Sequence, residues 1–150
     1  MMLALVRPDS WNFPLFLHVL GAIALAGSIG AVTVLAFAVR RRPQHGAVLS
    51  RVAFQTLIFV VVPAWIVMRV GAQLIEDKEF PGDKGPGWVD VGFVVSEPGL
   101  IVLIALGVLA WVSARRGGVG RASAAVAILA PVYLAALVVA WWAMSAKPGG

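Results

Sequence analysis

The sequence contains no cysteine. Disulfide bonds, thiolate metal sites, iron–sulfur clusters and cysteine catalysis are therefore excluded. Charged residues are also scarce: they make up 13% of the chain, while apolar residues make up 61%, against roughly 25% and 45–50% in an ordinary soluble domain. A soluble protein of 150 residues has nowhere to place so much apolar surface. A lipid bilayer is the solvent that accepts it.

Four apolar segments are long enough, or nearly so, to cross the hydrocarbon core, which takes about 20 helical residues. They cover residues 13–39, 52–75, 91–114 and 122–146. Strands are not expected, because an open sheet edge leaves its backbone groups unsatisfied in lipid. The sequence predicts an all-α membrane protein, a single transmembrane domain (1–150) folded as a four-helix up-down bundle with an outer loop at 76–90.

The gaps between these segments differ in charge. The gaps at 40–51 and 115–121 contain seven arginines, whereas the gap at 76–90 contains five acidic residues and two lysines. Because basic residues stay on the cytoplasmic side, we predict a multi-pass protein of the bacterial cytoplasmic (inner) membrane with both termini outside. The lipid bilayer is then the expected partner. Arginines in short turns between apolar runs do not indicate binding to nucleic acid.

Two charged residues fall inside the predicted membrane segments, where a charge is costly and marks a functional hypothesis. Arg69 precedes the outer loop and Glu97 follows it. At the helical rise per residue, each lies roughly 10 Å below the point where its helix meets the loop. We predict an intramembrane ion pair between them. One interpretation is a staple that joins the second and third helices. The other is a small proton- or anion-coupled transporter that uses both residues.

The start of the third helix has two interpretations. On hydropathy it begins near residue 91. However, Ser96-Glu97-Pro98 resembles a helix start, with a cap residue, an acidic first turn and an early proline. In that case the membrane helix begins at 97 or 98, and Glu97 lies closer to water.

His18 begins a stripe of small residues at four-residue steps, namely Ala22, Ala26 and Gly30. Such a stripe allows another helix to approach closely. We predict that the His18-Ala22-Ala26-Gly30 face contacts a helix of the same chain, a second copy in a homo-oligomer, or a membrane-protein partner. On the first interpretation of its role, His18 makes a hydrogen bond across that interface.

The other interpretation of His18 is a ligand to haem b or copper, in an electron-transfer or metal-handling protein. Haem b between helices normally takes two axial histidines, and the other histidine, His45, is predicted at the opposite face. A dimer could pair two copies of His18. Met68 or Met144 could also be the second ligand, because thioethers suit copper(I).

Motifs of hydrolytic or nucleotide-dependent enzymes are missing. The sequence has no HExxH, no GxSxG and no Walker A pattern, which are the spacings that such chemistry needs. The leading prediction is therefore an integral membrane protein that is not an enzyme, acting as a subunit of an oligomeric membrane assembly.

The segment LFLHVLGAIALAGSIG (15–30) looks like the opening helix of uncharacterised bacterial four-helix integral membrane proteins, which are similar to the membrane domain of copper-resistance D proteins. The matching features are His18, Gly21, the small residues 26–31 and the arginines 40–42. The ending AWWAMSAKPGG (140–150) is similar to the last helix of actinobacterial proteins of this kind. The resemblance covers the chain loosely and implies an integral membrane protein, with a copper or haem role at His18.

Overall fold

The structure is a computed structural model that describes residues 9–79 and 87–146. Its elements, in chain order, are η1 (Asp9–Trp11), α1 (Asn12–Arg41), η2 (Pro43–His45), α2 (Gly46–Thr56), the π-helical turn η3 (Leu57–Val61), α3 (Val62–Glu79), α4 (Gly87–Arg115) and α5 (Arg121–Ala146). These residues include no strand, and four of their helical stretches are long and apolar enough to cross a membrane. The predicted all-α class with four membrane-length helices is confirmed.

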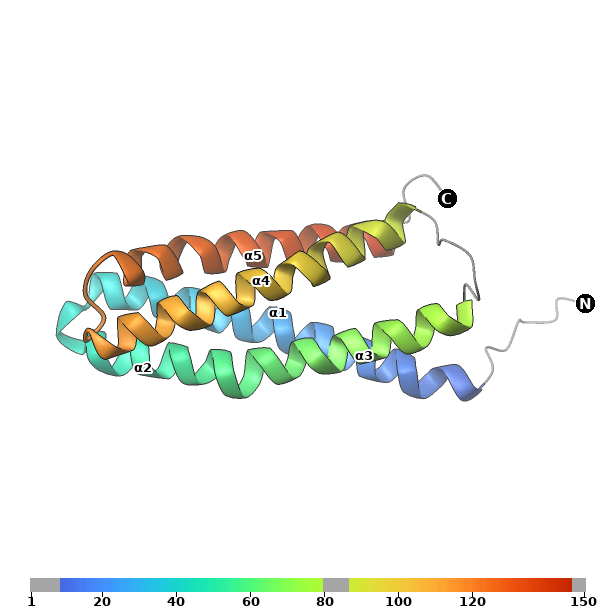
Figure 1. The fold of residues 1–150 in the computed structure, drawn as a ribbon, viewed down its shortest axis with the longest axis horizontal. Helices are drawn as coiled ribbons and strands as arrows, with labels where there is room; N and C mark the ends of the chain where they lie inside the picture. Colours follow the sequence, from blue (N-terminus) through green and yellow to red (C-terminus); the bar gives the residue numbers. More distant parts are fainter. Residues whose placement is uncertain (1–8, 80–86, 147–150) are drawn as a thin grey trace, which may run out of the picture.

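Four rods lie side by side along the long axis of the molecule (Figure 1). The second rod is the continuous series α2, η3 and α3. The turns from α1 to α2 and from α4 to α5 lie at one end, which we call the turn end (Figure 1). At the opposite end, the terminal end, α1 and α4 begin and α3 and α5 finish. Helix α1 packs along α3, α5 packs along both α1 and α4, and α2 packs against α4.

The second rod is longer than hydropathy predicts. It begins at Gly46, not at 52, and continues to Glu79, not 75. Gln73 supports the extra turn of α3, because its side chain donates hydrogen bonds to Glu76 and Asp77 three and four residues later. The predicted outer loop 76–90 is therefore helical at both of its ends, and residues 80–86 lie outside the described residues.

Helix α4 runs without a break from Gly87 through Pro98 to Arg115. The interpretation of Ser96-Glu97-Pro98 as a helix start is therefore wrong, and the start predicted near 91 is four residues late. A proline removes only its own N–H bond and displaces one carbonyl, which a helix anchored on both sides tolerates. In the second rod, the π-helical turn Leu57–Val61 ends two residues before Pro63. Both a π-helical turn and a proline interrupt the regular hydrogen bonds of an α-helix.

The bundle is apolar inside and outside. Its interior is formed by aliphatic side chains from all four rods, among them Leu25, Ile29, Leu57 and Leu106. Its surface also exposes many large apolar side chains, for example Ile23, Phe59, Ile101, Ile128 and Trp141. A helix that is apolar all round is typical of a membrane span.

The turn between α4 and α5 uses glycines in the left-handed region. Gly117, Gly118 and Gly120 have φ values of 67°, 84° and 99°, which side-chain-bearing residues rarely adopt. A Cβ on Gly118 would also lie 2.6 Å from the carbonyl oxygen of Gly46 at the start of α2. These glycines follow the end of α4, and they let the turn pack against α2.

Helices α1 and α3 come into backbone contact at two glycines. A Cβ on Gly21 would overlap the backbone nitrogen of Met68, and a Cβ on Gly71 would overlap that of His18. Both neighbours are main-chain atoms, so they cannot move aside as a flexible side chain would. Close approach through small residues is the main way in which membrane helices gain packing energy. This crossing therefore fixes α3 against α1.

We expect Gly71→Ala to destabilise the protein, because the new methyl group must force the two backbones apart. Overpacking of this kind costs about 1–3 kcal/mol, which exceeds the gain of roughly 1 kcal/mol in helix propensity. Thermal unfolding in mild detergent measures the change. The matched control is Gly107→Ala on α4, where a Cβ meets nothing within 4 Å and stability should be equal or higher. Equal behaviour of the two variants would contradict the close crossing.

Candidate functional site

Polar side chains of α3 and α4 meet in the half of the bundle near the terminal end. We call Trp65, Arg69, Gln73, Ser96 and Glu97 the polar seam. The three residues of α3 are spaced four apart and so lie along one face of that helix. Since α3 packs along α1 and α4 along α5, side chains from this face are what join α3 to α4.

Arg69 and Glu97 form an ion pair across the seam. The distance from Arg69 Nη2 to Glu97 Oε1 is 3.1 Å, and the two side chains are 21% and 62% exposed. Arg69 Nη1 also donates to Gln73 Oε1 at 3.0 Å. Glu97 lies mostly at the surface of the bundle, and a pair that is exposed to water contributes about 1 kcal/mol or less.

Hydrogen bonds continue from this pair to the terminal end. Gln73 Nε2 donates to Glu76 Oε2 at 3.2 Å and to Asp77 Oδ1 at 3.0 Å. The series therefore runs from Glu97 through Arg69 and Gln73 to two carboxylates. It orients the guanidinium toward the polar end of α3, as expected of an arginine that snorkels. An amide in the middle has no titratable proton, so the series orients charges better than it carries protons.

A second contact across the seam is neutral. Trp65 Nε1 donates to the backbone carbonyl of Ser96 at 3.1 Å. That carbonyl lies one residue before Glu97, so the two bridges from α3 reach adjacent residues of α4. Together they fix α4 at the level of Pro98, where the proline has removed one of the helix's own hydrogen bonds.

Two buried hydroxyl groups occur at this level, one on Ser96 of α4 and one on Tyr133 of α5. Ser96 Oγ and Tyr133 Oη have no hydrogen-bond partner within 9–79 and 87–146. The Tyr133 hydroxyl is packed against Gly99, where a Cβ would lie 2.7 Å from it. Sequence reasoning considered Ser96 only as a helix cap and missed Tyr133. The signal that could have found Tyr133 is that it is the single tyrosine of the chain, placed in an apolar helix.

His18 lies at the crossing of α1 and α3. Its Nδ1 is 3.2 Å from the backbone carbonyl oxygen of Met68. A carbonyl only accepts, so this hydrogen bond requires a proton on Nδ1. The hydrogen bond joins the same two helices as Gly21 and Gly71. The structure therefore gives His18 the interface hydrogen bond that was one of its two predicted roles.

The two candidate methionines lie in different interfaces. The buried Met68 contacts Gly21 on α1, while the methyl group of Met144 contacts Gly92 on α4. Met68 thus meets α1 beside His18, and Met144 lies between α5 and α4. No group of three or more His, Cys, Asp or Glu side chains that could hold a metal ion occurs in the described ranges. A haem or copper site at His18 stays a prediction.

The predicted small-residue face divides into two parts. At its start, His18 is engaged with α3. Farther along α1, a Cβ on Gly27 or Gly30 would meet nothing within 4 Å, and both Gly27 and Ala31 are exposed. Spacing predicts that the stripe faces a helix, but among residues 9–79 and 87–146 only its first part meets one.

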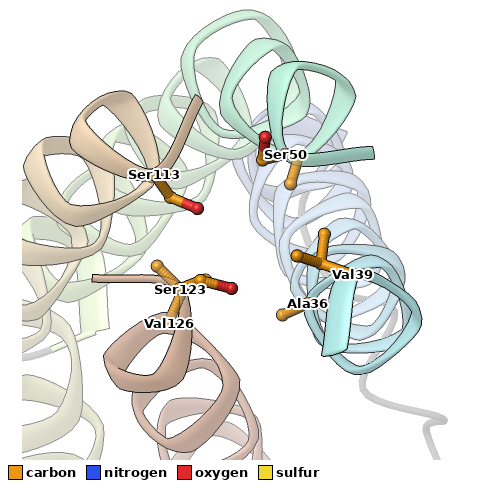
Figure 2. Close-up of a pocket in the computed structure, with 8 residues that line it drawn as sticks. Ala36, Val39, Ser50, Ser113, Ser123 and Val126 are labelled. Atoms are coloured by element: carbon orange, nitrogen blue, oxygen red, sulfur yellow. The ribbon is translucent and has the colours of Figure 1, made fainter. Parts of the chain in front are cut away.

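A small cavity lies at the turn end among α1, α2, α4 and α5 (Figure 2). Ser113 and Ser123 direct their hydroxyl groups into it (Figure 2), whereas the hydroxyl of Ser50 donates to the carbonyl of Gly46 at 2.7 Å. The space open to the centre of a water molecule is about 10 Å³, close to the minimum that one water needs. The cavity is too small for an organic substrate.

Comparisons with protein-family models, curated proteins and solved structures find no match for this chain. The resemblance to the copper-resistance D membrane domain therefore stays a prediction.

We expect the variants Arg69→Ala and Glu97→Gln to be coupled in stability, because each removes the same ion pair. A double-mutant cycle of unfolding free energies in detergent should give a coupling of about 0.2–1 kcal/mol, as for other partly exposed pairs. The cycle is needed because Arg69 makes further interactions that its own removal also breaks. Additive losses would contradict the staple. Single variants that keep full stability but lose flux of a charged solute would favour the transporter.

Proposed function

We propose that the chain is a multi-pass protein of the bacterial cytoplasmic membrane with its turn end in the cytoplasm and both termini outside. The distribution of charge carries this proposal. The seven arginines of 40–51 and 115–121 belong to the turn end, while acidic residues such as Glu76, Asp77 and Asp90 lie toward the terminal end. Basic residues in short loops remain cytoplasmic. The guanidinium of Arg115, 4.9 Å from the Trp111 ring centroid, is consistent with an interfacial anchor.

Single-cysteine labelling tests this orientation without background, because the chain has no cysteine of its own. Ser10→Cys places a thiol at the terminal end and Gln44→Cys places one in the α1–α2 turn, both at exposed positions. We expect a membrane-impermeant maleimide to label the first in intact spheroplasts and the second only after lysis. The reverse pattern would invert the topology. Recovery of the protein in the soluble fraction would reject the membrane location.

Within the membrane, we infer that the chain is a non-enzymatic subunit of an oligomeric assembly and that α1 contacts the neighbouring subunit. The supporting observation is the open part of the small-residue face. A glycine costs roughly 1 kcal/mol in a helix relative to alanine, and no contact within the described chain requires one at Gly27 or Gly30. Gly27 and Ala31 are four residues apart, as are Ala26 and Gly30. Both pairs have the spacing of small residues that associate membrane helices.

The flanks of this face also fit a helix–helix contact. Ile23 and Val34, four residues before Gly27 and three after Ala31, are both 67% exposed. Larger side chains on either side of a glycine groove give the partner helix a surface to pack against. A partner that approaches here would cover apolar and small side chains only, so the contact needs no charged group.

We expect Gly27→Leu to weaken self-association of the purified protein about tenfold or more, because the side chain fills the groove that a second helix would enter. Fluorescence energy transfer between labelled copies, diluted in a lipid bilayer, measures the change. Gly107→Leu is the matched control. A Cβ on Gly107 also meets nothing within 4 Å, but the residues four positions before and after Gly107 are Leu103 and Trp111, which are large. Association that is unaffected by Gly27→Leu would reject this face. Monomers alone in native mass spectrometry, with no co-purified partner, would reject the assembly.

A further inference from the structure

A groove lies on the outside of the turn between α1 and α2. It is lined by Ala38, Arg42, His45, Val48 and Leu49 and leaves about 280 Å³ open to water-sized groups. This is much more space than the serine cavity contains. The groove is also open to the surroundings at the surface of the bundle, so a ligand can enter it without any helix moving.

One part of the groove is lined by the polar side chains of Arg42 and His45, and the other part is apolar. Arg42 and His45 are exposed at the turn itself, where α1 has ended. Val48, 66% exposed, and the half-buried Leu49 continue along the first turns of α2. An amphipathic ligand therefore finds a place for a polar head and a place for an apolar chain, side by side.

The side chains of Arg42 and His45 are available to a ligand in the groove. Arg42 and His45 bond to their neighbours only through backbone atoms, Arg42 N to Ala38 O and His45 N to Arg42 O. No ion pair or side-chain hydrogen bond engages either side chain in the part of the chain that the structure describes. An arginine presents a planar fork that matches two phosphate oxygens. Histidine keeps at least one N–H donor in either protonation state.

The charge around the groove has one sign. Six further arginines belong to the same end of the bundle, namely Arg40, Arg41, Arg51, Arg115, Arg116 and Arg121. None of the seven acidic residues of the sequence falls within 40–51 or 115–121. An anion in the groove therefore meets no nearby carboxylate from the turns. The same field repels a headgroup that carries its own cation.

We propose that this groove binds the phosphate headgroup of an anionic phospholipid. Arg42 and His45 donate to the phosphate, and an acyl chain runs over Val48 and Leu49. The ligand comes from the bilayer around the protein, so the proposal rests on the membrane location proposed above. Phospholipids with a choline headgroup share the phosphate, but their ammonium group is unfavourable beside the arginines, so an anionic lipid is preferred.

Native mass spectrometry of the purified full chain tests the proposal by counting retained lipid. Phosphatidylglycerol and phosphatidylcholine with identical acyl chains are offered at equal concentration. We expect wild-type protein to retain phosphatidylglycerol preferentially. Replacement of both donor side chains (Arg42→Gln with His45→Gln) should lower its retention by about fivefold or more, given the usual attraction of a basic residue such as Arg42 to an anionic membrane surface. Val48→Glu, at an exposed position, should lower it further by placing a carboxylate in the groove.

Arg121→Gln is the matched control, because it removes one exposed positive charge from the same end but outside the groove. It should retain most of the lipid. Equal losses in Arg121→Gln and in the groove variants would overturn the proposal in favour of general surface charge. Equal retention of the two lipids would overturn it as well. So would displacement of the lipid by inorganic phosphate at similar concentration, which would indicate a plain anion site. Unchanged unfolding temperatures without lipid show that the variants fold, and the labelling experiment tests the membrane location separately.

Discussion

The backbone contact between α1 and α3 is the constraint on which the rest of the bundle depends. Apolar helices gain little from contacting each other in lipid, so close packing and hydrogen bonds must hold them together. Gly21 and Gly71 provide the packing, and the His18–Met68 hydrogen bond adds a polar link at the same level. Since Met68 faces α1, Arg69 is turned about 100° around the helix, toward α4. The crossing therefore determines where the polar seam lies.

The seam then joins the helices that the crossing leaves apart. Helix α3 has its main packing against α1, so its link to α4 depends on long side chains. Trp65 and Arg69 reach two adjacent residues of α4, one through a carbonyl and one through a carboxylate. Buried behind them are hydroxyls of Ser96 and Tyr133 that lack partners in the described chain. A polar region of this kind inside an apolar bundle is costly unless it is satisfied, so this is where a bound water or a movement of α4 would have most effect.

Sequence reasoning could predict the helices and the common level of Arg69 and Glu97, because hydropathy and a fixed rise per residue determine both. It could not predict the helix ends. Hydropathy does not account for the side-chain hydrogen bonds of Gln73 that support the last turn of α3. Ser96-Glu97-Pro98 has the pattern of a helix cap, although it lies inside α4. Spacing also shows which residues share a face of α1. Whether that face turns inward depends on where α3 packs, which is a property of the whole bundle.

The two ends of the bundle differ in whether their charged groups have partners within the chain. Toward the terminal end, polar groups find partners within the chain: Arg69 binds Glu97, Gln73 binds two carboxylates, and Lys78 donates to the carbonyl of Ser10 at 2.5 Å. At the turn end, residues 40–51 and 115–121 contain seven arginines and no acidic residue that could neutralise them. The first arrangement contributes to cohesion. The second leaves a positive potential that only the surroundings can neutralise, so the turn end, more than the seam, is the part of this chain suited to bind an anion from outside.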